Sequence, residues 1–157
     1  MCTGVSSVKA VRAKESDCKE VLSFVHRVNE SIEQYTVLDP FSMIQNGKLR
    51  GRLIRQTLFD GRYQVCLIRT ESTEPCGMLI TAKGAALRSR SSSLVFFILE
   101  RGIQIGEMRW GGTEAPCRVA AITEGGCGSG LEQFGFRRSV AVELANGSMN
   151  YYFLEVG

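Results

Sequence analysis

At 157 residues, the chain has the length of a single domain with a hydrophobic core of its own. It is 44% hydrophobic and 22% charged, and its apolar run Leu94–Leu99 is far shorter than the roughly 18–20 residues that span a bilayer. The net charge of +3 permits an anionic ligand but lacks the strongly basic character of most nucleic-acid-binding proteins. Composition therefore predicts neither a membrane nor a nucleic-acid partner.

The N-terminus and the cysteines indicate where the protein works. The first residues lack the apolar segment of a signal peptide, which predicts a cytoplasmic protein. The six cysteines show no C-x-x-C spacing, and His26 is the only histidine. The pattern predicts free, mostly buried thiols and no metal site.

The first elements expected are a short strand and a helix. Val8–Val11 alternates weakly and predicts a strand, and Asp17 with Glu20 has the form of a capping box, with Ser16 as a competing N-cap. His26 lies beside the apolar stripe and is expected to pack. The stripe itself recurs at helical spacing: Cys18, Val21, Leu22, Val25, Val28 and Ile32.

The next stretch, Tyr35–Leu58, is ambiguous in its secondary structure. Asp39-Pro40 breaks regular structure, and Asn46-Gly47 is a turn signal. Leu49–Leu58 carries arginines at 50, 52 and 55. They predict a solvated face, with a basic surface for an acidic partner as the alternative.

A hairpin and a buried strand are expected in the middle of the chain. Tyr63–Ile68 and Gly77–Thr81 read as its two strands, joined by a polar loop of roughly seven residues. The serine-rich, basic stretch Lys83–Ser93 predicts a mobile excursion. Leu94–Leu99 then predicts a buried strand.

The stretch Ser91–Met108 carries the main functional signal. Its apolar block runs directly into Arg101–Gly106, and the chain is expected to turn helical from Ile105 until Gly111-Gly112 and Pro116 end the helix. A strand that ends in a glycine turn and opens a helix offers backbone N–H groups to phosphate oxygens. The alternative is a plain core strand followed by a loop.

The remaining chain predicts three more strands. Cys117–Ile122 reads as a strand and Thr123–Gly130 as a glycine-rich loop, with a short helical turn or none at Leu131–Phe136. Arg138–Leu144 and Met149–Val156 flank Asn146-Gly147, a hairpin signal. The order of elements predicts an α/β fold with a mixed sheet.

In this order, four segments resemble the GNAT superfamily of acyl-CoA-dependent N-acetyltransferases. Val8–Phe24 resembles the opening strand and first helix, and Tyr63–Ile80 resembles the central hairpin. Phe96–Gly106 is similar to the strand and pyrophosphate loop, Q/R-x-x-G-x-G/A, and Leu131–Phe136 to the segment before the last two strands. The resemblance implies one domain over residues 1–157, with a mixed, largely antiparallel central sheet flanked by helices.

The resemblance also implies a reaction and a site. It implies transfer of an acetyl group from acetyl-CoA to a small-molecule or protein amine, and it allows a homodimer. Glu100, beside the loop, as a base, and Tyr151, on the last strand, are the candidate catalytic residues that could substitute for missing family groups; a solvated loop carboxylate and a packed ring are the alternatives. The residues implied to bind the cofactor are Phe97, Ile98 and Leu99 for pantetheine, and Arg101, Gly102, Ile103, Gln104, Ile105 and Gly106 for pyrophosphate.

Three positions depart from the family pattern. Gln104 replaces a glycine, Leu131 replaces a thiolate-protonating tyrosine, and Leu94-Val95 replaces an acidic residue before the paired aromatics. These departures support a second hypothesis, a non-catalytic α/β interaction module that is either a degenerate acetyltransferase fold or unrelated to it. Its acidic partner would bind the basic segments Leu49–Leu58 and Lys83–Arg90.

Overall fold

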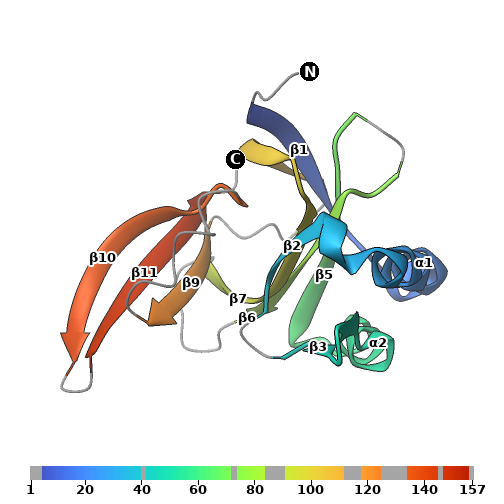
Figure 1. The fold of residues 1–157 in the computed structure, drawn as a ribbon, viewed down its shortest axis with the longest axis horizontal. Coiled ribbons are helices and arrows are strands. Elements are labelled where there is room, and N and C mark those ends of the chain that lie inside the picture. Colours follow the sequence, from blue (N-terminus) through green and yellow to red (C-terminus); the bar gives the residue numbers. More distant parts are fainter. Residues whose placement is uncertain are drawn as a thin grey trace.

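The computed structural model describes residues 5–39, 42–71, 74–83, 91–111, 118–124, 134–144 and 147–155. Its helical elements (Figure 1) are η1 (Glu15–Asp17), α1 (Cys18–Glu30), η2 (Ile32–Gln34) and α2 (Gly51–Leu58). Its strands are β1 (Val5–Arg12), β2 (Tyr35–Leu38), β3 (Ile44–Gln45), β4 (Lys48–Leu49), β5 (Tyr63–Arg69), β6 (Gly77–Lys83), β7 (Ser91–Glu100), β8 (Gln104–Gly111), β9 (Arg118–Glu124), β10 (Arg137–Leu144) and β11 (Gly147–Glu155).

A nine-stranded sheet forms the centre of the fold. Its order is β10-β11-β9-β7-β6-β5-β1-β8, with β2 added to β7. Among the strand pairs of the described residues, only β1–β8 and β7–β9 are parallel, which confirms the expected mixed, largely antiparallel sheet. Figure 1 shows β9, β10 and β11 as an arm that projects away from the strands covered by the helices.

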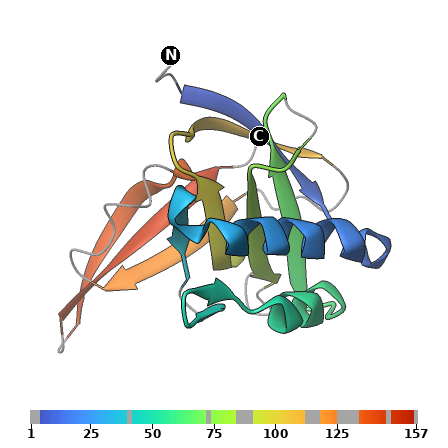
Figure 2. The ribbon, with the colours of Figure 1, turned by 45° about the vertical axis from the view of Figure 1, so that its right-hand side comes forward.

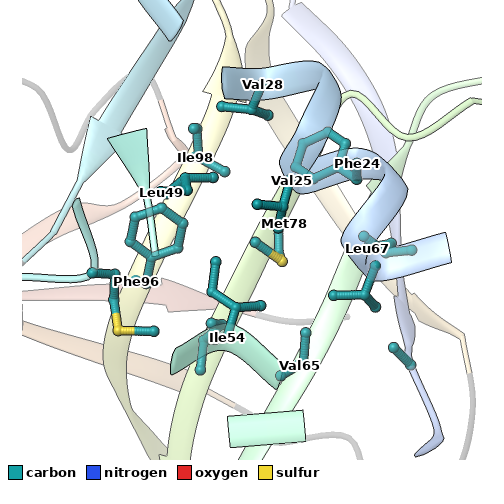
Figure 3. Packing of buried hydrophobic residues seen from close by; sticks show 14 of the residues in the cluster. Phe24, Val25, Val28, Leu49, Ile54, Val65, Leu67, Met78, Phe96 and Ile98 are labelled. Carbon is teal, nitrogen blue, oxygen red and sulfur yellow. The ribbon is translucent and has the colours of Figure 1, made fainter. Parts of the chain in front are cut away.

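Both α-helices cover the same face of the sheet. In Figure 2, α1 crosses the strands, with α2 below it. The apolar stripe of α1 buries Val21, Phe24, Val25 and Val28, as its helical spacing predicted. Together with Ile54 of α2, these side chains meet the inward-facing residues of β5, β6 and β7 in one core (Figure 3).

Two local expectations for α1 are wrong. Its N-cap, Asp17, makes no side-chain capping bond to the helix, because its carboxylate accepts the Lys14 N–H at 2.8 Å and closes η1 instead. His26 does not pack: its side chain is 78% exposed, with Nε2 2.9 Å from Glu30 Oε1. His26 lies beside the apolar stripe of α1 but on a side of the helix that faces solvent.

The opposite face of the sheet has a second core, to which the described parts of α1 and α2 contribute nothing. Phe97 of β7 meets Phe134 and Phe136, with ring centroids 4.4 and 6.2 Å away. Ile105 and Met108 of β8 belong to the same cluster. The cluster runs from β7 through β6, β5 and β1 to β8, so it covers this face of the sheet across five neighbouring strands.

The helix expected from Ile105 is wrong, because the chain forms strand β8 there. Gly106 and Gly111 disfavour a helix, and β1 offers an edge on which β8 pairs in parallel. Gly106 is the extra residue of a bulge, since Ser6 pairs with Ile105 and Ser7 with Glu107. Ile105 and Met108 are three positions apart, a spacing that would put them on opposite faces of a regular strand. The bulge brings both to the same buried side.

The other predicted turns and hairpins are confirmed where the structure describes them. Asn46 and Gly47 have φ of 54° and 73° in the turn between β3 and β4. The arginines at 50, 52 and 55 are exposed on and beside α2. The pairs β5–β6 and β10–β11 form antiparallel hairpins, and residues 70–76 connect the first.

Some expectations fall on parts of the chain that are not described. Residues 84–90 of the expected mobile excursion lie outside the described residues, while Ser91–Ser93 belong to β7 rather than to a loop. Residues 125–133, including Leu131, also lie outside them. Within the described ranges, no helix is both long and apolar enough to cross a membrane.

Candidate functional site at the outer edge of β7

The two edges of β7 are paired differently. One edge pairs with β6 from Ser92 to Leu99. The other edge, called here the outer edge, pairs in parallel with β9 at Ser91–Ser93 and in antiparallel with β2 at Phe97–Glu100. No described strand pairs with Leu94–Phe96 on the outer edge, so the sheet opens there between β9 and β2.

A β-bulge lies at this opening. Ile80 of β6 pairs with Phe96 and Thr81 with Leu94, which leaves Val95 as the extra residue. Val95 and Phe96 consequently both join the core under the helices. A bulge redirects backbone N–H and C=O groups away from the regular ladder, so such groups are available to hydrogen-bond a ligand beside β7.

A buried hydroxyl group adjoins the bulge. Thr81 is fully buried, and its Oγ1 has no hydrogen-bond partner in the described part of the chain. An unsatisfied buried hydroxyl costs stability, and this one lies on the β6 side of the bulge, across β7 from the opening. Nothing in the amino-acid pattern of β6 marked this residue.

The structure places Glu100 and Tyr151 on different arms of the sheet. Glu100 ends β7, is half-buried, and pairs with Tyr35 of β2. Tyr151 lies on β11 opposite Ile122, so β9 separates its strand from β7. Along the strands, Tyr151 is level with the bulge, because Ser93 pairs with Ala120 and Ile122 follows two residues later.

Glu100 also influences a neighbouring thiol. Burial raises the pKa of Cys76 to about 11, and the Glu100 carboxylate adds to that rise. Burial alone raises the pKa of Cys66 to about 12, against a small opposing effect of Arg12. Cys18, Cys66 and Cys76 are free, and the latter two are buried and protonated at neutral pH.

The segment Arg101–Gly106 is a tight turn followed by the first residues of β8. Gly102 has φ of +92°, a conformation that favours glycine. The Arg101 N–H donates to the Gln34 carbonyl at 2.8 Å, and the Ile103 N–H donates to the Glu100 carbonyl at 3.3 Å. Two of the three turn amides are therefore engaged within the chain, and no helix N-terminus stands behind them.

The Arg101 side chain is also engaged. Its Nε donates to the Glu33 carbonyl at 2.8 Å, so the guanidinium fastens η2 to the end of β7. Gln104 and Gly106 are exposed at the start of β8, whereas Ile105 is buried. The exposed positions are those that a ligand beside this turn would meet.

A cavity reaches the bulge from the helical face of the sheet. It has a volume of about 370 Å³ and is bounded by α2 and the adjoining ends of β5, β6 and β7. Val95, Thr57, Tyr63 and Asp60 are among its lining residues. Arg62 donates hydrogen bonds to the Asp60 carboxylate and lowers its pKa to about 2, so the carboxylate stays ionised.

Sequence reasoning missed three of these features: β2, the Val95 bulge and the cavity. Only β2 had a usable signal, because Tyr35-Thr36-Val37 is a run of strand-favouring residues before the Asp39-Pro40 break. The bulge depends on the register between β6 and β7. The cavity depends on how α2 sits on the sheet.

Comparison with solved structures defines the fold. The aminoglycoside N-acetyltransferase AAC(6')-Ib11 matches with a TM-score of 0.50 at 12% identity, covering 96% of this chain and 97% of that one. An acetyltransferase from Thermus thermophilus gives 0.48 at 17% identity, covering 96% and 98%. A chimera of the Vibrio cholerae spermidine N-acetyltransferase SpeG with hSSAT gives 0.49 at 10%, covering 96% and 96%.

At these identities, the likeness concerns the fold, and the assignment rests on the aminoglycoside N-acetyltransferase. No protein-family model matches the sequence, and no curated protein matches it. The chain has a GNAT-like acetyltransferase fold, which confirms the fold that its motif order implied.

Proposed function

We propose that the protein, as one GNAT-like domain over residues 1–157, transfers an acetyl group from acetyl-CoA to an amine. The single observation that carries this proposal is the opening in the outer edge of β7 at Leu94–Phe96, where the bulge lies. An opening beside a strand offers backbone hydrogen bonds and an apolar floor to an extended ligand. With the free thiols, the proposal includes a cytoplasmic location.

The proposed cofactor site follows the outer edge of β7. Phe97 and Leu99 would hold the pantetheine arm as an added strand, through their outward-facing backbone groups, with Ile98 between them; in this structure β2 pairs with that edge. The pyrophosphate would lie over the turn, at Arg101, Gly102 and Ile103, and at the exposed start of β8. The start of β8 contributes Gln104, Ile105 and Gly106 to this pyrophosphate site, and Gln104 and Gly106 are exposed.

The proposed chemistry assigns one role to each group. Acetyl-CoA supplies the thioester. Backbone N–H groups around the Val95 bulge hold the thioester oxygen as negative charge develops on it. Tyr151, level with the bulge, gives a proton to the departing thiolate as the C–S bond breaks, and the acceptor amine loses its proton to water as the new C–N bond forms. Glu100 lies five residues along β7 from the bulge, roughly 16 Å in an extended strand, so it would take up that proton through water and not by direct contact.

The acceptor amine is proposed to enter through the 370 Å³ cavity, because that cavity ends at Val95. A small amine, or a lysine or N-terminus of a protein, would place its nitrogen at the bulge from the helical side. Most of the acceleration would come from holding the two reactants in line. A site that lacks one family residue therefore retains part of its rate.

The test is calorimetric titration of the full chain with acetyl-CoA, using two isosteric charge variants. Gln104→Glu adds a negative charge where the pyrophosphate is proposed to lie, and Gln45→Glu adds the same charge on β3; both glutamines are exposed. We expect micromolar binding, weakened about tenfold by Gln104→Glu and unchanged by Gln45→Glu. Absence of heat at millimolar acetyl-CoA would refute the proposal.

A thiol-release assay over a panel of amines then tests the transfer itself, with a homodimer tested by light scattering on the same samples.

The second hypothesis, a non-catalytic module for an acidic partner, draws on the exposed arginines 50, 52 and 55. This second hypothesis is supported if acetyl-CoA gives no heat and an acidic peptide is bound by the wild type but not by Arg52→Glu. Acetyl transfer unaffected by Arg52→Glu would favour the enzyme.

A further inference from the structure

Strand β2 pairs with the part of β7 that the proposed cofactor site requires. Its four residues pair with Phe97–Glu100 on the outer edge (Figure 1). β6 already pairs with Phe97–Leu99 on the other edge. In the structure as it stands, the backbone of this segment of β7 is therefore paired on both sides.

The register shows which backbone groups β2 uses. The Arg101 N–H donates to the Gln34 carbonyl, whereas the Glu100 N–H donates away from β2, to Cys76. In an antiparallel ladder, hydrogen-bonded pairs alternate, so the next such pair is Thr36 with Leu99. The backbone groups of Thr36 face β7, and those of Val37 face away from it.

Both ends of β2 are anchored, and its middle is half-buried, with Val37 and Leu38 packed against the cores on the two faces of the sheet. Tyr35 is buried and packs edge-on against Phe24, with ring centroids 6.2 Å apart. Beyond the other end, the Asp39 carboxylate accepts the N–H groups of Met43 and Ile44, at 2.6 and 2.9 Å. The residues between, Thr36–Leu38, are only half-buried.

We propose that β2 is a self-inhibitory strap that must leave β7 before acyl-CoA binds along Phe97–Leu99. The inference rests on the proposed function, since it concerns the same edge of the same strand. One N–H or C=O group cannot complete a ladder with β2 and with an added pantetheine arm at once. The two occupants therefore exclude each other. Only Thr36–Leu38, between the anchors at Tyr35 and Asp39, need to leave β7, so α1 and the β3–β4 hairpin stay in place.

Competition of this kind makes the cofactor affinity depend on the strap. The apparent dissociation constant equals the intrinsic constant divided by the fraction of molecules with β2 detached. A change that weakens β2 pairing raises that fraction and tightens binding. Ordinary damage near a binding site has the opposite effect, so the direction of the change is diagnostic.

Two adjacent proline variants provide a matched pair. Thr36→Pro removes a donor that faces β7, and Val37→Pro removes a donor that faces away from it. In calorimetric titrations with acetyl-CoA, we expect Thr36→Pro to bind about two- to tenfold more tightly than the wild type, the range that a lost backbone hydrogen bond allows. Val37→Pro should bind within about twofold of the wild type.

Amide hydrogen exchange on the wild type gives an independent readout that needs no variant. At saturating acetyl-CoA, peptides that cover Tyr35–Leu38 should exchange faster than in the free protein, while peptides from α1 should not change. If acetyl-CoA binds and β2 becomes no less protected, the strap is overturned and the proposed function stands. The strap is likewise overturned if Thr36→Pro binds no more tightly than Val37→Pro.

The proposed function and the strap fail in different ways. No binding by the wild type or by either variant would overturn both, because an edge freed of β2 would still not take the cofactor. Binding by Thr36→Pro alone would support both, since it would show a competent edge that the strap keeps closed.

Discussion

At Gly77, β6 lies so close to β7 that a side chain would not fit between the two strands. A Cβ added at Gly77 would lie 2.4 Å from the Ile98 carbonyl oxygen and 3.1 Å from Leu99 Cδ1. The oxygen belongs to a strand in the middle of the sheet, so it cannot move without disturbing the pairing on both sides of β7. Gly77→Ala must therefore push the two strands apart.

Overpacking of a well-packed core typically costs about 1–3 kcal/mol, and a clash with backbone lies at the upper end. We expect Gly77→Ala to lower the free energy of unfolding by about 2–3 kcal/mol. For a chain of this length, that corresponds to a fall in Tm of about 4–12 °C. Urea titration followed by circular dichroism, with a thermal melt, measures both quantities.

Gly61→Ala is the matched control, since a Cβ there meets nothing within 4 Å. We expect its free energy of unfolding to stay within about 0.5 kcal/mol of the wild type. If Gly77→Ala were as stable as Gly61→Ala, β6 and β7 would not approach as closely as described. The register that defines the Val95 bulge would then have to be revised.

Three further changes test the cores and the buried polar groups by urea titration. Phe134→Ala should cost about 3–5 kcal/mol, because the fully buried ring packs at a tilt against Phe97, with ring centroids 4.4 Å apart. Asn29→Ala should cost about 1–3 kcal/mol, because its amide both donates to and accepts from the backbone of Leu49. Burial raises the pKa of Cys66 from 9.0 to about 12, so its contribution to stability is full below pH 9. Above pH 9 the unfolded thiol ionises first, and the free energy of unfolding should fall by up to about 1.4 kcal/mol per pH unit, more steeply than in Cys66→Ala.

For each of these three changes, a different result would contradict the reasoning. A cost below about 1 kcal/mol for Phe134→Ala would place that ring outside the core. Asn29→Asp keeps an acceptor for the Leu49 N–H, so a cost equal to that of Asn29→Ala would show that this bond adds nothing. Equal slopes for wild type and Cys66→Ala between pH 9 and 11 would mean that the thiol is accessible to water.

The sequence was sufficient where one local pattern had one structural solution. Val21, Val25 and Val28 fall on one face only in a helix, and α1 buries that face. Asn46-Gly47 adopts the positive φ angles that few other residue pairs tolerate. These patterns sufficed for the α/β class and the hairpins.

Local pattern failed where a distant part of the chain chose between two solutions. Ile105 and Met108 have a spacing that suits a helix, but the free edge of β1 and the bulge at Gly106 make the same spacing suit a strand. Asp17 is a different case, because its competitor is local: the N–H of Lys14, three residues earlier, donates to the carboxylate and closes the 3₁₀ turn before α1. For β8, the competing partner cannot be recognised from the segment alone.

The amino-acid sequence by itself determined the fold class and directed attention to β7 and the turn that follows it. Only the tertiary structure decided how the outer edge of β7 is shared among β9, the opening at Leu94–Phe96, and β2. The physical reason is that the backbone groups of a strand have no sequence signature. Which partner satisfies them depends on which other segments the fold brings alongside.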